Sequence, residues 1–356
     1  MKSGISFILL LLPFVSFAQV QATKYANEFL AIGVGGRAQG MGNTHVAIAD
    51  DVTAGYWNPA GLLHQSNQYE VMLQHGEYFS GIAKYDYGAF SMKIDSSSGI
   101  GFSLIRFGID DIPDTRFLYD ANGAINYDNV TFFSAADYAF ISSYARKLNI
   151  LGGLKFGGNF KIVHRKAGDF ASAWGFGLDV GAQLDYKKWQ FGAVFRDVTG
   201  TFTAWSHNTD EIINVFTQTD NDIPQNSVEV TVPRLILGAA RYFQLQEFGL
   251  LPTLDLTFTF DGERNTLIKS GFSSIDPTLG LEADYKKIAF LRFGLRNIQE
   301  LKTFDSSTKL SIEPTFGIGF NYKSVTVDYA LSSVGAHTEG LYSHIFSLKF
   351  NFDGNQ

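Results

Sequence analysis

The stretch WGFGLDVGAQLDY, residues 174–186, alternates between two kinds of side chain without a break. Apolar or aromatic residues occupy every second position, and glycine, aspartate or glutamine fills the positions between them. Alternation with a period of two is the pattern of a β-strand whose faces meet different surroundings. An apolar face toward lipid and a polar face toward water is typical of a transmembrane barrel. Because the pattern recurs along the chain, the sequence predicts an all-β fold, a transmembrane antiparallel β-barrel.

Candidate strands of this kind number fourteen, an even count that suits a closed bacterial barrel. In two of the clearest, 252–261 and 323–332, apolar residues again interleave with Thr, Asp or Ser. The predicted strands are 69–75, 82–94, 100–109, 134–147, 152–165, 172–186, 188–198, 233–243, 252–261, 275–287, 288–297, 312–322, 323–332 and 342–352.

Connection lengths support the same architecture. Short turns follow the strands ending at 186, 287 and 322, whereas the chain takes long loops at 110–133, 199–232 and 262–274. Bacterial barrels have short turns on the periplasmic side and longer loops outside. The short turns carry Tyr-Lys pairs at 186–187, 285–286 and 322–323. Such side chains suit a membrane interface, where ammonium groups reach the headgroups.

The first 18 residues have the features of an export signal. Lys2 precedes the apolar run 5–17, and Ser16 and Ala18 suit signal peptidase, which would leave Gln19 first. No later run approaches the roughly 18 apolar residues of a membrane helix. The chain has no cysteine, which excludes a lipoprotein anchor and a disulfide framework. These observations predict the outer membrane of a Gram-negative cell.

The charge balance is acidic. The chain has 28 basic and 35 acidic residues, and loss of Lys2 with the signal leaves 27 against 35, a net charge of −8. This argues against nucleic-acid binding. No linker divides the second half, so the predicted organisation is a signal peptide at 1–18, an N-terminal segment at 19–65 and one barrel at 66–356.

Residues 19–65 do not have the pattern of a strand. They hold three runs, at 29–42, 46–51 and 54–62, of which the first is rich in glycine. A nucleotide-binding loop is rejected because no strand precedes the glycines and no amphipathic helix follows. The glycines instead predict an irregular segment that threads a crowded lumen.

These runs resemble the FadL-like outer-membrane superfamily, and within it the PorV/PorQ family associated with type IX secretion. The matching motifs are GGRAQGMG at 35–42, AIADD at 47–51 and YWNPAG at 56–61. The resemblance implies a hatch inside a fourteen-stranded barrel. The hatch residues that it implies are Gly35, Gly36, Arg37, Gly40, Gly42, Asp50, Asp51, Trp57, Asn58, Pro59 and Gly61.

Several of these residues have more than one interpretation. Arg37 is a lone cation among glycines, either in an ion pair with Asp50, Asp51 or Asp179 that pins the hatch or in direct contact with a ligand. The two adjacent aspartates could hold calcium, but turn or capping duty is the simpler role. Asn58-Pro59 predicts a turn before the first strand. The remaining lumen charges predict either a selectivity lining or a buried network bracing the hatch: Arg106, Arg196, Arg292, Arg296, Asp179 and Asp255.

Neither a catalytic nor a metal site is predicted, and no cofactor is implied. The seven histidines lack metal-ligand spacing. Ser343 and His344 are neighbours on one strand and therefore point to opposite faces. A triad drawn from His164, His207, Ser103 and Ser142 has no supporting pattern, so the protein is predicted not to be an enzyme.

The resemblance implies two functions. The first is that of a shuttle, whose partners besides outer-membrane lipid are the type IX translocon and the C-terminal domains of its cargo. Contact residues are then expected in the two long polar loops: Tyr119, Asn122, Tyr127, Trp205 and Phe216. The alternative is a FadL-like channel for hydrophobic small molecules such as fatty acids, with the hatch as its gate.

Overall fold

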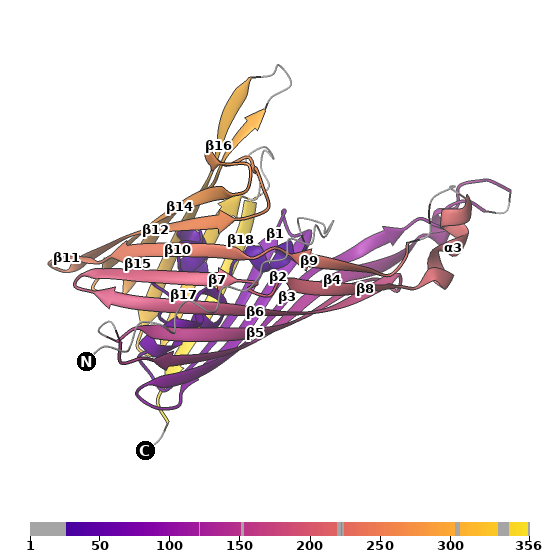
Figure 1. Cartoon of the computed structure of the whole chain (residues 1–356). Coiled ribbons are helices and arrows are strands. Elements are labelled where there is room, and N and C mark those ends of the chain that lie inside the picture. The colour runs from indigo at the N-terminus through magenta and orange to yellow at the C-terminus, as the bar shows by residue number, and fades with distance from the viewer. Residues whose placement is uncertain are drawn as a thin grey trace, which may run out of the picture.

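The computed structural model describes residues 26–120, 122–150, 153–218, 222, 224–302, 307–333 and 342–354. The predicted signal peptide lies outside these residues. The strands form one sheet that curls into a barrel, and each strand of the wall is antiparallel to its neighbours (Figure 1). The first and last strands pair with each other, with Tyr69 opposite Phe352, so the wall is closed.

The closed wall contains fourteen strands, which confirms the predicted fold and count. Every one of the fourteen predicted segments overlaps a strand of the wall. In order around the barrel the strands are β1 (Tyr69–Tyr78), β2 (Ala83–Lys93), β3 (Ser98–Asp114), β4 (Thr131–Lys147), β5 (Lys155–Ala167), β6 (Ala171–Tyr186), β7 (Trp189–Arg196), β10 (Arg234–Arg241), β12 (Phe248–Thr259), β14 (Ser274–Tyr285), β15 (Ala289–Lys302), β16 (Thr308–Tyr322), β17 (Val325–Ser333) and β18 (Tyr342–Phe352).

Short turns lie at one end of the barrel, which we call the turn end, and the long connections lie at the other, the loop end (Figure 1). Three further strands belong to the long connections: β8 (Thr201–His207), β9 (Ser227–Thr231) and β13 (Ile268–Lys269). A fourth, β11 (Phe243–Leu245), lies in the short connection between β10 and β12 at the turn end. The short helices outside the lumen are α3 (Thr209–Gln218) and η3 (Tyr127–Asn129).

The prediction that 199–232 is a loop is wrong. β8 continues the line of β7 past an irregular stretch at 197–200, and it pairs with the first half of β6. Asp197 and Gly200 take the positive φ angles, 54° and 70°, that this interruption needs. β9 then pairs with β8. The interruption hides the strand from a sequence pattern, but the backbone groups at the start of β6 still require a partner.

The other two predicted loops are also partly strand. β3 runs on to Asp114 and β4 begins at Thr131, so the loop predicted at 110–133 is shorter than expected, and 262–274 contains β13. Together β3, β4, β5, β6, β8 and β9 extend past their neighbours at the loop end (Figure 1). They form a projection, which we call the arm, with α3 at its tip (Figure 1). β15 and β16 form a separate projecting hairpin (Figure 1).

The outer surface of the wall is apolar and aromatic. On β6, Trp174, Phe176 and Leu178 are 54%, 40% and 41% exposed, whereas the glycines and Asp179 between them face inward and are buried. Trp174 and Tyr186 bound this apolar stretch, 12 residues apart. At about 3.3 Å per residue and a tilt of about 45°, that spans roughly 28 Å, close to the apolar thickness of a membrane barrel. Among the described helices, none is long and apolar enough to cross a membrane.

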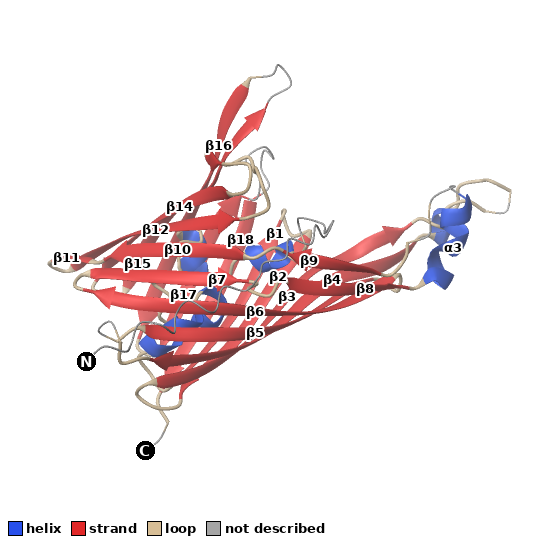
Figure 2. Cartoon of the chain, viewed as in Figure 1, coloured by secondary structure: helices blue, strands red, loops and turns tan. Residues whose placement is uncertain are grey.

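Residues 26–65, which we call the lumen segment, form four short helical turns and no strand. These are η1 (Glu28–Ala31), α1 (Gly36–Gly40), α2 (Ala54–Trp57) and η2 (Pro59–His64), and they lie within the ring of strands (Figure 2). The largest apolar cluster of the protein packs this segment against β1–β4 and the end of the circuit, so the core fills the barrel. The boundaries predicted at 18 and 65 stay a prediction.

Candidate functional site

The lumen segment makes polar contacts with strands on every side of the barrel. The Oδ2 atom of Asp255 on β12 accepts hydrogen bonds from the backbone N–H groups of His45 and Val46, at 3.0 and 3.1 Å. On β16, Thr315 accepts from the N–H of Gly42 at 2.9 Å, and on β18, Ser347 accepts from the N–H of Gly36 at 3.0 Å. The barrel wall thus supplies the acceptors that an irregular backbone needs inside a lumen.

Glycine in the wall lets the segment approach this closely. A Cβ atom on Gly294 of β15 would lie 2.0 Å from the backbone nitrogen of Gly42, and one on Gly192 of β7 would lie 2.3 Å from the carbonyl oxygen of Val46. Gly40 of α1 meets the backbone of Gly317 in the same manner. The glycines of the motif at 35–42 and those of the strands therefore form one close-packed backbone interface.

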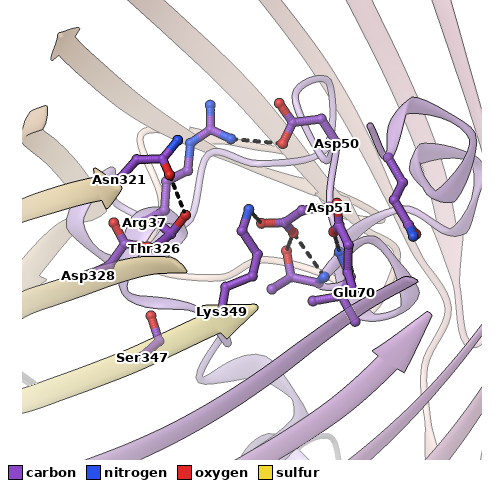
Figure 3. Close-up of polar contacts among 12 residues, drawn as sticks. Arg37, Asp50, Asp51, Glu70, Asn321, Thr326, Asp328, Ser347 and Lys349 are labelled. Atoms are coloured by element: carbon purple, nitrogen blue, oxygen red, sulfur yellow. Dashed lines mark hydrogen bonds and ion pairs between the residues drawn. The ribbon is translucent and has the colours of Figure 1, made fainter. Parts of the chain in front are cut away.

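A buried ion network joins the segment to the wall on the side of β14, β15 and β17. Arg37 pairs with Asp50 at 2.8 Å and with Glu282 on β14 at 2.9 Å. Glu282 also pairs with Arg292 at 2.6 Å, and Arg292 continues to Asp328 at 2.7 Å. The close-up shows Arg37 reaching toward Asp50 at one end of this network (Figure 3). Arg37 is therefore the link between the motif and the strands.

Asp51 takes part in a second link. Its side chain pairs with Lys349 on β18 at 2.7 Å (Figure 3). It also accepts a hydrogen bond from the hydroxyl of Thr53 at 2.6 Å. Burial by itself favours the neutral acid, but Lys349 holds the pKa of Asp51 well below its usual range. No group of three His, Cys, Asp or Glu side chains that could hold a metal ion exists among the described residues. The two aspartates thus serve two different ion pairs.

The motif at 56–61 fixes the segment to itself and to β6. The indole N–H of Trp57 donates to the carbonyl of Val34 at 2.9 Å. The amide of Asn58 donates to Val46 and to Ala182 on β6, both at 3.0 Å. Its oxygen accepts from the N–H of Ala60, so Asn58 caps η2, whose first residue is Pro59. Gly61 packs against the carbonyl oxygen of Ala49. The predicted turn at 58–59 is therefore a helix start.

Most of the predicted lumen charges do lie inside the barrel, but one does not. Arg292, Arg296, Asp179 and Asp255 are buried, and Arg196 lies over the rings of Tyr56 and Trp57. Arg296 pairs with Glu313, and Asp179 pairs with Lys161 at 2.7 Å. Arg106 instead faces outward near Asp86. Ser103 faces the lumen beside Tyr87, whereas His164 stacks outside on Trp174, so these two do not meet.

An apolar surface lies above the lumen segment at the loop end. Ile32, Phe79, Phe107 and Ile109 are half-buried and pack on the central apolar cluster. Phe79 belongs to the β1–β2 turn, and Ile109 lies opposite Ala83 at the same end of the wall. We call these four residues the apolar mouth. It gives the loop end of the lumen a surface suited to apolar molecules.

A cavity of about 980 Å³ opens on the opposite side of the segment, at the turn end. Its lining is largely charged, and the ion pairs of Arg37 and Lys349 form part of it. The residues from the short turns include Asp185, Lys187 and Lys287. The lumen segment therefore separates an apolar mouth from a water-suited cavity.

The five predicted contact residues are scattered over the arm. Tyr119 and Tyr127 are 64% and 76% exposed, and Asn122 is exposed beside them. Trp205 on β8 is half-buried under the guanidinium of Arg165, and Phe216 on α3 is half-buried as well. The structure thus brings the first three together in one connection. Their role stays a prediction.

Sequence reasoning missed Glu282, Asp328 and Lys349, the partners that hold Arg37 and Asp51. Each occupies a polar position in an alternating strand, which marks it as lumen-facing. Which strand lies beside which part of the segment depends on the closed circuit, and no local pattern contains that information.

No family model matches the chain, and no curated protein matches it. Several solved structures match the chain in fold. The toluene transporter TodX of Pseudomonas putida superposes with a TM-score of 0.57 at 14% identity, over 91% of this chain and 99% of that one. The monoaromatic hydrocarbon channel CymD gives 0.54 at 12% identity, over 91% and 99%.

A FadL homologue of Pseudomonas aeruginosa gives a TM-score of 0.52 at 12% identity, over 88% of this chain and 97% of that one. Identities this low establish the architecture. The chain has the fold of the FadL-like outer-membrane channels, a closed antiparallel barrel of fourteen strands with its N-terminal segment in the lumen.

Proposed function

We propose that the protein is an outer-membrane channel through which hydrophobic small molecules pass, with the lumen segment as its gate. The observation that carries this proposal is the order of surfaces along the barrel axis: apolar mouth, lumen segment, charged cavity. The structures with the same fold are a toluene transporter, a hydrocarbon channel and a FadL homologue, which supports the assignment.

The wall explains why a gate is needed. It is closed around the full circuit, and the segment occupies its lumen with a packed core on one side and ion pairs on the other. A molecule that enters at the apolar mouth therefore passes only if the segment shifts. The contacts of Arg37 and Asp51 are polar and face the water-suited cavity. When these contacts break, water can hydrogen-bond to the freed groups, so breaking them costs less than breaking apolar contacts.

Uptake by whole cells tests the proposal. Cells lacking other hydrophobic-compound channels would express the protein, and accumulation of labelled toluene and labelled oleate would be followed against labelled glucose. The proposal predicts faster uptake of at least one hydrophobic compound than in cells with an empty vector, and no change for glucose. Equal rates for all three compounds with and without the protein contradict it.

The arm favours a second candidate function, that of a type IX secretion shuttle. The arm extends the wall at the loop end and presents Tyr119 and Tyr127 to solvent, and exposed aromatic residues are strong anchors for protein partners. That surface and the resemblance of the motifs at 35–42 and 56–61 to PorV/PorQ together support this second proposal.

Affinity purification separates the two candidates. The tagged protein would be isolated from outer membranes in mild detergent and its protein partners identified by mass spectrometry, beside a variant in which Tyr119 and Tyr127 are alanine. The shuttle proposal predicts recovery of a translocon barrel or secreted proteins with a shared C-terminal domain, reduced in the variant. A solitary barrel contradicts it and leaves the channel.

A further inference from the structure

Three cations and two aromatic rings gather at the turn end, beside the β6–β7 turn. We call Lys187, Lys188, Arg241, Trp189 and Phe243 the basic turn patch. Arg241 lies directly opposite Trp189 in the pairing of β10 with β7. All five residues border the outer rim of the cavity at this end. The patch therefore belongs to one stretch of wall formed by β6, β7 and β10.

Arg241 is held as an open donor. Its guanidinium carbon lies 5.5 Å from the ring centre of Trp189 and 4.7 Å from that of Phe243. Its Nε atom is buried, and no hydrogen-bond acceptor meets it among the described residues. Two ring contacts fix the guanidinium group, but they satisfy none of its N–H groups. Such a group is prepared to bind an oxyanion through its free donors.

The cations of the patch lack acidic partners. No carboxylate oxygen lies within 4.0 Å of Lys187, Lys188 or Arg241 in the part of the chain that the structure describes. The nearby Asp185 is bound to Lys155 at 2.6 Å. At the β14–β15 turn, by contrast, Lys286 has Glu247 as its partner at 3.0 Å. The three cations of the patch therefore carry positive charge that no paired carboxylate cancels.

The patch lies at the edge of the apolar belt on the outside of the barrel. Trp189, Phe191 and Phe195 lie on the outward, exposed face of β7, in line with the apolar belt. Lys187 stands at the turn with a φ of 56°, and its ammonium group lies 5.2 Å from the ring centre of Tyr186. Cations and amphipathic rings at the edge of an apolar belt lie at the level of lipid headgroups.

We propose that the basic turn patch binds the phosphate group of an anionic phospholipid in the leaflet at the turn end. Arg241 supplies paired N–H donors to the phosphate, Lys187 and Lys188 supply charge, and Trp189 and Phe243 contact the glycerol and the upper acyl chain. The proposal requires that the barrel span a membrane, and it is independent of what the lumen transports.

Related turns supply the comparison. Tyr285-Lys286 and Tyr322-Lys323 repeat the geometry of Tyr186-Lys187, with lysine φ angles of 54° and 56° and ammonium-to-ring distances of 5.3 Å. Neither has a stacked arginine, although Lys287 also lies over the ring of Tyr242 beside the first of these turns, at 5.2 Å. We therefore expect ordinary interfacial contact there and a lipid-selective site only at the basic turn patch.

Native mass spectrometry of the delipidated full-length protein tests the proposal. The probes are phosphatidylglycerol, the zwitterionic phosphatidylcholine and inorganic phosphate. The test variant is Lys187→Gln/Lys188→Gln/Arg241→Gln, and the control is Lys166→Gln/Lys269→Gln/Lys309→Gln, which removes equal charge at the loop end. Each cation near a membrane surface adds to the attraction for an anionic lipid. The sum over three cations predicts a preference of about 100-fold for phosphatidylglycerol over phosphatidylcholine.

The wild type and the control should keep that preference, and the test variant should lose it while its thermal melting and spectrum stay those of a folded barrel. A preference retained by the test variant, or none in the wild type, overturns the proposal. Displacement of bound phosphatidylglycerol by millimolar inorganic phosphate also overturns it, since the site would then belong to a free anion.

Discussion

Arg37 and Glu282 are joined by two hydrogen bonds, from Nε at 2.9 Å and from Nη2 at 3.0 Å, although 245 residues separate them in the chain. The contact ties the glycine-rich motif to β14. Arg292 on β15 also binds Glu282, at 2.6 Å, so the carboxylate would keep a partner if Arg37 left it. Arg37 and Asp50 are thus the members of the network that the lumen segment contributes.

Replacing Arg37 by Gln should loosen the gate. Hydrogen bonds to charged groups are worth about 1.5–3 kcal/mol, and Glu282 keeps a partner, so the barrel itself should remain folded. Planar-bilayer recordings should show more frequent openings than in the wild type. Arg116→Gln, which removes a similar ion pair with Asp114 in the arm, is the control and should leave the openings unchanged. Unchanged openings in Arg37→Gln would argue against a role in gating.

Replacing Asp255 by Ala should free the segment near its middle. The N–H groups of His45 and Val46 lose their acceptor, at a cost of about 1–3 kcal/mol for each buried amide left unpaired. Hydrogen–deuterium exchange should therefore speed up at 45–46 more than at the strands. Asp255→Asn keeps an acceptor oxygen in place and should show the smaller effect. Equal protection in all three proteins would contradict this account.

Acid should weaken the packed segment through His45. Burial, with help from Arg37, lowers the pKa of His45 to about 4. The unfolded chain binds a proton near pH 6.5 and the folded one only near 4, so stability falls as the pH drops through that window and levels off below it. Urea unfolding midpoints at pH 7 and 4.5 measure this. His45→Asn, which cannot be protonated, should show a smaller difference between the two pH values.

The outer surface should reject charge in its middle and tolerate it at its edge. Phe316 on β16 faces outward, six residues from Tyr322 at the turn end, so it lies at about half the height of the apolar belt. Phe316→Arg should destabilise the barrel by about 2–4 kcal/mol in lipid vesicles, and Tyr322→Arg by about 0–1 kcal/mol. Phe316→Leu controls for the lost ring. Equal losses for both arginines would contradict the placement of the belt.

The sequence predicts the barrel well because each strand carries its own evidence. In β6 and β12 the alternation of apolar and polar residues marks strand, faces and length together. It fails at 199–232, where the interruption at Asp197–Gly200 separates β8 from the strand that it extends. For the site, the sequence predicts the residues of the lumen segment but not their partners on the wall. The motif identifies Arg37 and Asp51, but their partners Glu282 and Lys349 depend on where the closed circuit brings β14 and β18.

The gate can be tested by fixing it to the wall. Built on Gly55 of α2, a Cβ atom would lie 3.7 Å from the Cβ atom of Ser143 on β4, within the range of disulfides. The chain has no cysteine of its own, so Gly55→Cys/Ser143→Cys would form a single defined bond. Each single-cysteine variant serves as a control for the substitutions.

The most direct measurement is uptake of labelled toluene and oleate by cells that carry this double variant, before and after reduction. If the lumen segment gates a channel for hydrophobic molecules, oxidised cells should fall to the rate of the empty vector, and reduction should restore the rate of the single variants. Uptake that is the same in oxidised and reduced cells would contradict the gate, and uptake no greater than the vector in the wild type would contradict the channel.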